Sequence, residues 1–361
     1  MIRSLSLTFL FALSHGAILG KAFHVYSPSS KENTLWIVKA TTKGENLKLE
    51  VAEKVKFDFS GRVITTHPSK PLLYVTSTGG DPGKVPGAVV FLNEDGSYQK
   101  HRKINFNDGA CYLSLDKGNR HLLGVSYGNG RLNVYPLDAN GIPGKAVTTI
   151  DEGKREAHCV LLPPDGKNVY VPYVKGNLAL LQYAYDDKTG KVTPLEPFDA
   201  KPPFGSGPRH MAYHPTLPMV YFSNEQGIGL SSYRRETNGQ LKVEQDISIL
   251  PPGMSKIGLS ASDLLITPDG QFLFAGLRGH RQDFSRISRY RVLEDGKAEF
   301  LGLTEADQVP WGLTLSPDGK FLLVSATTGA SLAAYRISKD GNLKRVATLA
   351  WDARMSDLVT R

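Results

Sequence analysis

The sequence predicts an all-β fold, a seven-bladed β-propeller with four-stranded blades. A short phrase, a tight turn followed by an apolar β run, returns along the chain at intervals of 48 to 53 residues. Repeats of this period that consist of strands are typical of propeller blades. The 36 glycines and 22 prolines suit a chain of short strands joined by many turns. The two chain ends carry further strands, which complete one more sheet.

The repeated phrase has six copies, each anchored on a residue of its turn. The anchors are Pro68, Asp116, Pro164, Pro215, Pro268 and Pro317. The copy at 316–324 reads Ser-Pro-Asp-Gly-Lys-Phe-Leu-Leu-Val, and its Asp-Gly pair suits a tight turn because glycine takes positive φ at no steric cost. One apolar strand leads into each anchor, a second leaves it, and a third and fourth follow. Six anchors therefore predict six blades.

The chain ends supply the seventh blade. Phe23 to Tyr26, Thr34 to Val38 and Leu47 to Val51 are three strands without a lead-in strand, and Ser356 to Thr360 is a strand with nothing after it. Pairing the two ends completes a four-stranded blade, closes the ring and removes the open edge of a cut sheet. Residues 23–361 are thus expected to form a single propeller domain.

The first 22 residues resemble a signal peptide. Arg3 supplies a positive charge, Leu5 to Leu13 is an apolar stretch too short to span a bilayer, and Gly20-Lys21-Ala22 resembles a cleavage site. His15-Gly16-Ala17 is a second possible site. We expect an exported protein, periplasmic or secreted, that is soluble and free of the membrane after cleavage.

Composition and the absence of several motifs exclude some classes of function and partner. The formal charge of +8 has two readings, solubility or attraction of a small anionic molecule. No basic run is interleaved with aromatic residues, so we expect no nucleic-acid partner. The chain has no H-E-x-x-H, G-x-S-x-G or Walker motif, which argues against a zinc protease, an α/β-hydrolase and a nucleotide hydrolase. Export would permit a disulfide between Cys111 and Cys159, but two small buried residues are expected.

Strand geometry places candidate site residues at one mouth of the central channel. The first strand of a blade is antiparallel to the second, so the start of the first and the end of the second lie on the same face. Counting from the anchors, this face gathers His158, Arg209, Glu225 and Arg278, with Trp311, Tyr173 and His210 nearby. Each could be structural by itself, for example through an Arg209–Glu225 pair. Together, a histidine, a carboxylate and two guanidiniums suit a small anionic ligand.

These residues also carry a family resemblance. The chain resembles the seven-bladed β-propeller lactonases, which include 6-phosphogluconolactonases of the cycloisomerase type and fungal carboxymuconate cyclases, over nearly all of its length after residue 22. The matching motifs are Ala157-His158-Cys159, Gly207-Pro208-Arg209-His210, His214-Pro215, Ser223-Asn224-Glu225, and Thr267-Pro268-Asp269-Gly270 followed by Arg278. The resemblance implies that the catalytic residues are His158, Arg209, Glu225 and Arg278. Trp311 stands where bacterial members often carry arginine, which, with export, favours an unphosphorylated lactone.

The expected function is hydrolysis of a small sugar-acid lactone, aldono- or phosphoaldono-, without a cofactor. His158 or Glu225 would take the proton of the attacking water, and His158 is favoured because two guanidiniums make a nearby carboxylate a weaker base. Arg209 and Arg278 would bind the oxyanion or a substrate carboxylate. No metal is expected, since one histidine and one carboxylate are fewer ligands than protein metal sites usually have. A lactone-forming cycloisomerase and a non-enzymatic propeller that binds a partner are the alternatives.

Overall fold

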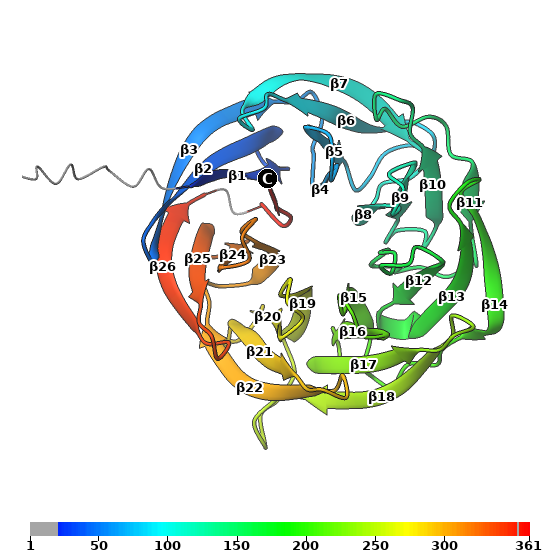
Figure 1. Ribbon diagram of the computed structural model, residues 1–361, viewed down its shortest axis with the longest axis vertical. Coiled ribbons are helices and arrows are strands. Elements are labelled where there is room, and N and C mark those ends of the chain that lie inside the picture. The colour runs from blue at the N-terminus through cyan, green and yellow to red at the C-terminus, as the bar shows by residue number, and fades with distance from the viewer. Residues whose placement is uncertain (1–20, 352–353) are drawn as a thin grey trace, which may run out of the picture.

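The computed structural model describes residues 21–351 and 354–361, and in these ranges it has 27 β-strands arranged as seven sheets around a central channel (Figure 1). The predicted seven-bladed propeller is confirmed. Of the expected signal peptide, residues 1–20 lie outside the described residues, and the first strand begins at Ala22.

Each blade is a meander that runs outward from the channel. The first comprises β27 (Val359–Thr360), β1 (Ala22–Ser29), β2 (Thr34–Lys43) and β3 (Asn46–Lys56). The second comprises β4 (Val63–Thr66), β5 (Leu72–Thr76), β6 (Val85–Leu92) and β7 (Tyr98–Phe106). The third comprises β8 (Tyr112–Leu115), β9 (His121–Val125), β10 (Leu132–Pro136) and β11 (Thr148–Ile150). The fourth comprises β12 (Asn168–Tyr173), β13 (Ala179–Asp186) and β14 (Lys191–Asp199).

The remaining blades follow the same plan. The fifth comprises β15 (Pro208–Tyr213), β16 (Met219–Asn224), β17 (Gly229–Arg235) and β18 (Leu241–Ser248). The sixth comprises β19 (Leu259–Ile266), β20 (Phe272–Gly279), β21 (Arg286–Val292) and β22 (Ala298–Glu305). The seventh comprises β23 (Pro310–Leu315), β24 (Phe321–Ala326), β25 (Ser331–Ile337) and β26 (Leu343–Ala350).

The two chain ends close the ring, as predicted. β27 runs antiparallel to β1 and pairs Val25 with Thr360. Beyond this pair, the His24 amide donates to the Arg361 carbonyl at 2.8 Å, and the Arg361 amide returns a bond to the His24 carbonyl at 3.0 Å. The first blade therefore takes its innermost strand from the C-terminus, which leaves no open edge between the first and last blades.

The fourth blade departs from the four-stranded prediction. Its expected innermost strand is reduced to two isolated bridges, Ala157 to Tyr173 and Leu161 to Tyr170. The His158 amide donates to the Pro172 carbonyl at 3.0 Å. Pro172 has no amide hydrogen to donate in return, so the ladder loses a bond in the middle of this strand pair. The segment still occupies the inner position and carries His158 to the channel.

Neighbouring blades are joined by tyrosine hydroxyls. Tyr26, Tyr74, Tyr170 and Tyr221, each in the second strand of its blade, donate to the carbonyls of Gly96, Gly141, Gly239 and Gly296, at 2.6, 2.8, 2.5 and 2.8 Å. Each acceptor lies in the turn between the third and fourth strands of the next blade, and its φ of 80–85° favours glycine. These four bonds tie the first, second, fourth and fifth blades each to the next one through a buried contact.

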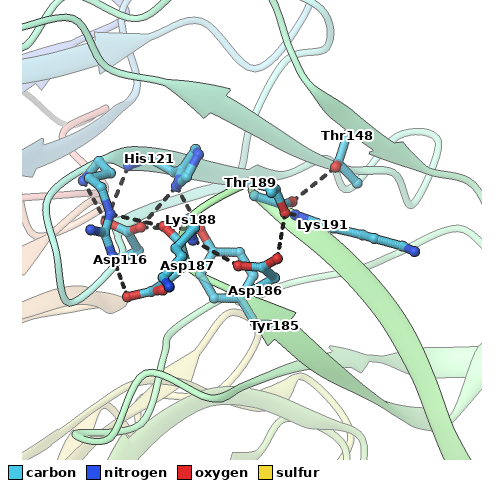
Figure 2. Close-up of polar contacts among 11 residues, drawn as sticks. Asp116, His121, Thr148, Tyr185, Asp186, Asp187, Lys188, Thr189 and Lys191 are labelled. Carbon is cyan, nitrogen blue, oxygen red and sulfur yellow. Dashed lines mark hydrogen bonds and ion pairs between the residues drawn. The ribbon is translucent and has the colours of Figure 1, made fainter.

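The junction of the third and fourth blades uses a different network. His121 Nδ1 lies 2.9 Å from Asp116 Oδ2 and 3.0 Å from the Tyr185 hydroxyl, which itself donates to Asp116 Oδ2 at 3.2 Å. Figure 2 shows these three side chains packed together, with the turn that carries Asp186 and Thr189 alongside. Asp116 and His121 belong to the third blade and Tyr185 to the fourth, so this network also links successive blades.

Candidate functional site

A cavity of about 520 Å³ lies at one mouth of the channel and is lined by residues from all seven blades. Six of the seven residues expected at this mouth line it, namely His158, Arg209, His210, Glu225, Arg278 and Trp311. They come from the starts of the inner strands and the ends of the second strands, where the repeat placed them. Antiparallel pairing brings both kinds of position to one face.

Tyr173 is the exception. It is 1% exposed, and its hydroxyl donates to the Gly130 carbonyl at 3.0 Å within the core between the third and fourth blades. Successive side chains of a strand point in opposite directions, and the one at this position points into the core rather than the channel. Tyr173 therefore does not line this cavity, contrary to its expected place at the mouth of the channel. Tyr127, which follows β9, lines the cavity instead, and its ring packs edge-on against His158 at 5.6 Å.

The two arginines share one carboxylate. Arg209 Nε lies 3.0 Å from Glu225 Oε2, and Arg278 Nη2 lies 3.6 Å from Glu225 Oε1. Strand pairing sets this arrangement, because β15 pairs Pro208 with Asn224 and the Glu225 amide donates to the Gly207 carbonyl at 2.7 Å. Two guanidiniums and one carboxylate leave the group with a net positive charge.

Several polar atoms of this ion-pair group lack hydrogen bonds. Arg209 Nε and Nη1, Arg278 Nε and Glu225 Oε2 are buried without a hydrogen-bond partner among residues 21–351 and 354–361, so the 3.0 Å contact is an ion pair without hydrogen-bond alignment. Buried polar atoms normally have partners. Burial, followed by the charge of Arg209, lowers the pKa of Arg278 to about 9, while Glu225 opposes this shift. The group therefore combines excess positive charge with buried donors that no acceptor among the described residues satisfies.

Trp311 forms a wall beside the arginines. The centre of its ring lies 4.4 Å from Arg278 Cζ and 6.0 Å from Arg209 Cζ. A guanidinium over an indole face is attracted to it, most strongly away from water. Trp311 therefore helps to hold Arg278, which also donates through Nη2 to the Ala261 carbonyl at 2.8 Å.

The two histidines have different environments. His158 makes no contact with a carboxylate among the described residues, and burial, followed by the charge of Arg209, lowers its pKa well below 6.5. It is therefore neutral at neutral pH and able to accept a proton. His210 is held through Nδ1 by Asp263 Oδ1 at 2.6 Å. Burial and Arg209 lower the pKa of His210 as well, against the effect of Asp263.

The lining residues that the sequence analysis did not single out include Asp263, Asp357 and Tyr127. Asp263 had a visible signal, since it is an acidic residue inside an apolar innermost strand, one position after Ser262. Asp357 precedes the closing strand, and its Oδ2 accepts the Ile64 amide at 2.8 Å. Burial raises the pKa of Asp357 to about 8, so this carboxyl carries a proton at neutral pH.

Other features of the chain bear on ligands. In the described ranges, no three His, Cys, Asp or Glu side chains converge in a way that could hold a metal ion. Cys111 and Cys159 are free thiols, and Cys111 lines the cavity. Over residues 21–351 and 354–361, the chain forms no helix with the length and apolar character that crossing a membrane requires.

Comparisons with known proteins point to one family. The family described as "Lactonase, 7-bladed beta-propeller" matches residues 25–353. The 6-phosphogluconolactonase of Klebsiella pneumoniae subsp. pneumoniae is 28% identical over 313 residues, which cover 86% of this chain and 89% of that protein. The 6-phosphogluconolactonase of Cronobacter sakazakii is 27% identical, covering 88% and 92%. The solved structure of the periplasmic gluconolactonase of Pseudomonas aeruginosa shares the fold, with a TM-score of 0.82, 19% identity and coverage of 94% and 99%.

Proposed function

The chain belongs to the lactonase family of seven-bladed β-propellers, and we propose that it hydrolyses a small sugar-acid lactone at the cavity described above. One observation carries the proposal. The guanidinium-bearing residues Arg209 and Arg278 line the same cavity as His158, whose ring is neutral at neutral pH. Lactone hydrolysis needs both of these, donors for a developing oxyanion and a proton acceptor for water.

The proposed reaction assigns a role to each of four residues. His158 takes a proton from water, and the water oxygen attacks the lactone carbonyl. Arg209 and Arg278 stabilise the negative charge that develops on the carbonyl oxygen. The ring C–O bond then breaks, and the departing alkoxide takes the proton from His158, which yields the open-chain hydroxy acid. Glu225 holds the two arginines at a fixed spacing.

Glu225 is a poor candidate for the base. Both of its carboxylate oxygens face guanidinium nitrogens, at 3.0 and 3.6 Å. Both oxygens are therefore engaged in ion pairs, whereas His158 forms no ion pair among the described residues and is neutral at neutral pH.

The proposed substrate is an unphosphorylated aldonolactone, met outside the cytoplasm. The apparent signal peptide at residues 1–22 and Trp311, at a position where arginine is frequent in the family, support this choice. The structural likeness to a periplasmic gluconolactonase agrees with it. The named relatives are 6-phosphogluconolactonases. The rate on unphosphorylated lactones should therefore be compared first with the rate on 6-phosphogluconolactone.

The test uses the chain from residue 23 onward, purified with a chelator present. Hydrolysis of glucono-1,5-lactone, galactono-1,4-lactone and 6-phosphogluconolactone is followed by proton release, and loss of a carboxymuconate by absorbance. We expect the unphosphorylated lactones to be opened with the highest kcat/KM. Exclusive turnover of the muconate would instead identify a lactone-forming cycloisomerase. Failure with every compound would leave the propeller as a binding module.

A further inference from the structure

Three side chains of the cavity wall lie in a row. Asp263 accepts the amides of Leu264 and Leu313, both at 2.8 Å, so its position is set by the backbones of two blades. Its Oδ1 lies 2.6 Å from His210 Nδ1. The rings of His210 and His158 follow, with centroids 5.2 Å apart and planes at 63°.

Asp263 determines the tautomer of His210. Coulombic attraction and hydrogen bonding from His210, and the Leu313 amide, lower the pKa of Asp263 despite the opposing effect of burial. An ionised carboxylate only accepts hydrogen bonds, so His210 carries its proton on Nδ1. The neutral ring then has a lone pair on Nε2. This atom is buried and lacks a hydrogen-bond partner among the described residues.

His158 has the complementary requirement. To take a proton from water on Nε2, the neutral ring must carry its other proton on Nδ1. That Nδ1 is also buried without a hydrogen-bond partner in the ranges that the structure describes. An acceptor without a donor and a donor without an acceptor therefore belong to two adjacent rings. Buried polar atoms are rarely left unsatisfied, and one water between the two rings would satisfy both.

We propose that Asp263, His210 and His158 form a relay in which Asp263 holds Nδ1–H of His210, and His210 Nε2 accepts Nδ1–H of His158 through one bridging water. The relay rests on the proposed lactone hydrolysis and adds two positioning residues to it. The proton taken from water stays on His158 Nε2 until the ring oxygen of the lactone receives it. Asp263 and His210 orient His158 and stabilise its protonated form, and neither changes its own protonation.

The charges around the relay explain why it is needed. The groups that face His158 and His210 are Arg209, Arg278, Tyr127, Tyr112 and Asp263. Both arginines oppose the protonation of His158, and Glu225 is already paired with them. Asp263 is the carboxylate in contact with the histidine pair, so it supplies the negative charge that offsets this repulsion when His158 takes a proton.

The test compares two buried His–Asp pairs in the full propeller. Asp263→Asn should lower kcat for lactone hydrolysis by about 100-fold or more while KM changes less than about threefold. The acid limb of kcat/KM should move to lower pH, because protonated His158 loses a stabilising charge. Asp116→Asn alters the His121–Asp116 pair, at 2.9 Å and outside the cavity (Figure 2), and should leave kcat and the pH profile unchanged.

Histidine side-chain spectra give a readout that does not depend on activity. Long-range proton–nitrogen spectra of histidine-labelled protein should show both His210 and His158 protonated on Nδ1. Asp263→Asn should change the tautomer of His158, although Asp263 forms its hydrogen bond with His210 and not with His158. If wild type is active and Asp263→Asn keeps its kcat and pH profile, the relay is wrong and the proposed function stands. If wild type opens no lactone, the proposed function fails, and a His158 proton on Nε2 would overturn the relay by itself.

Discussion

Glu225 Oε2 lies 3.0 Å from Arg209 Nε, yet these two buried atoms make no hydrogen bond to each other. The pair is held by charge, and its buried donors lack acceptors among the described residues. Two guanidiniums beside one carboxylate keep an excess of positive charge at the cavity wall, which favours an anionic ligand.

Glu225→Gln should destabilise the protein. Two buried guanidiniums would lose the carboxylate that separates them, and breaking a buried ion pair costs roughly 3–5 kcal/mol. Urea unfolding should show a loss of this order, and added phosphate should recover part of it by occupying the arginines. A variant as stable as wild type, or indifferent to phosphate, would mean that the arginines do not form an anion site.

Arg209→Gln should reduce kcat for lactone hydrolysis by roughly 100- to 1,000-fold, which is the usual cost of removing one oxyanion donor. The matched control is Arg234→Gln, which removes the pair with Glu244 on the outer strands, away from the cavity. Steady-state kinetics on both variants measure the effect. Equal losses in the two would show that Arg209 acts on folding and not on the reaction.

The rate should depend on pH through His158. Burial and Arg209 lower its pKa well below 6.5, and only the neutral ring accepts a proton. The profile of kcat/KM should therefore be flat around neutral pH and fall only in the acid range, well below pH 6.5. An acid limb centred above pH 6.5 would exclude His158, as placed here, from the role of base.

Asp357 should make stability fall as pH rises. In the unfolded chain this carboxyl ionises near pH 3.8, whereas in the folded protein it keeps its proton up to about pH 8. Unfolding between these values therefore releases a proton and becomes easier with increasing pH. Asp357→Asn removes the effect, so its stability relative to wild type should improve by roughly 4–5 kcal/mol from pH 4 to pH 8. Urea denaturation across that range measures it, and a constant difference would contradict the assignment.

Tyr221→Phe should cost about 1–2 kcal/mol, because it leaves the Gly296 carbonyl in the next blade without its 2.8 Å bond. Tyr183→Phe is the control, since the buried hydroxyl of Tyr183 has no hydrogen-bond partner among the described residues. Its removal should leave stability nearly unchanged. Denaturant unfolding distinguishes them, and equal costs would mean that the bond between blades contributes nothing.

The blade count and the closure of the ring follow from the sequence because both depend on local patterns. The turn at Pro317 and the apolar run after it would form the same hairpin wherever they stood. The reduction of the innermost strand of the fourth blade to two isolated bridges was harder to predict. It depends on Pro172 lying opposite His158, a pairing between residues of separate strands.

The repeat also determined which residues reach the mouth of the channel. The position of a residue within the repeat determines how far along its strand it lies. This position alone brought a set of four residues to one cavity, namely His158, Arg209, Glu225 and Arg278. Position along a strand does not determine the direction in which a side chain points. Tyr173 lies at the expected end of its strand but points into the core, and Tyr127 lines the cavity instead.

Only the tertiary structure decided which cavity residues contact one another and which of their polar atoms lack partners. The contact of Asp263 with His210 joins two blades across 53 positions of sequence, and the buried, unpartnered atoms of Arg209 and His158 arise from packing around the whole channel. Hydrogen bonding and desolvation depend on atoms within a few ångströms in space. Local sequence patterns determine the closed propeller and the position of each residue along its strand. Contacts between distant blades determine the charge and the protonation state of each cavity group.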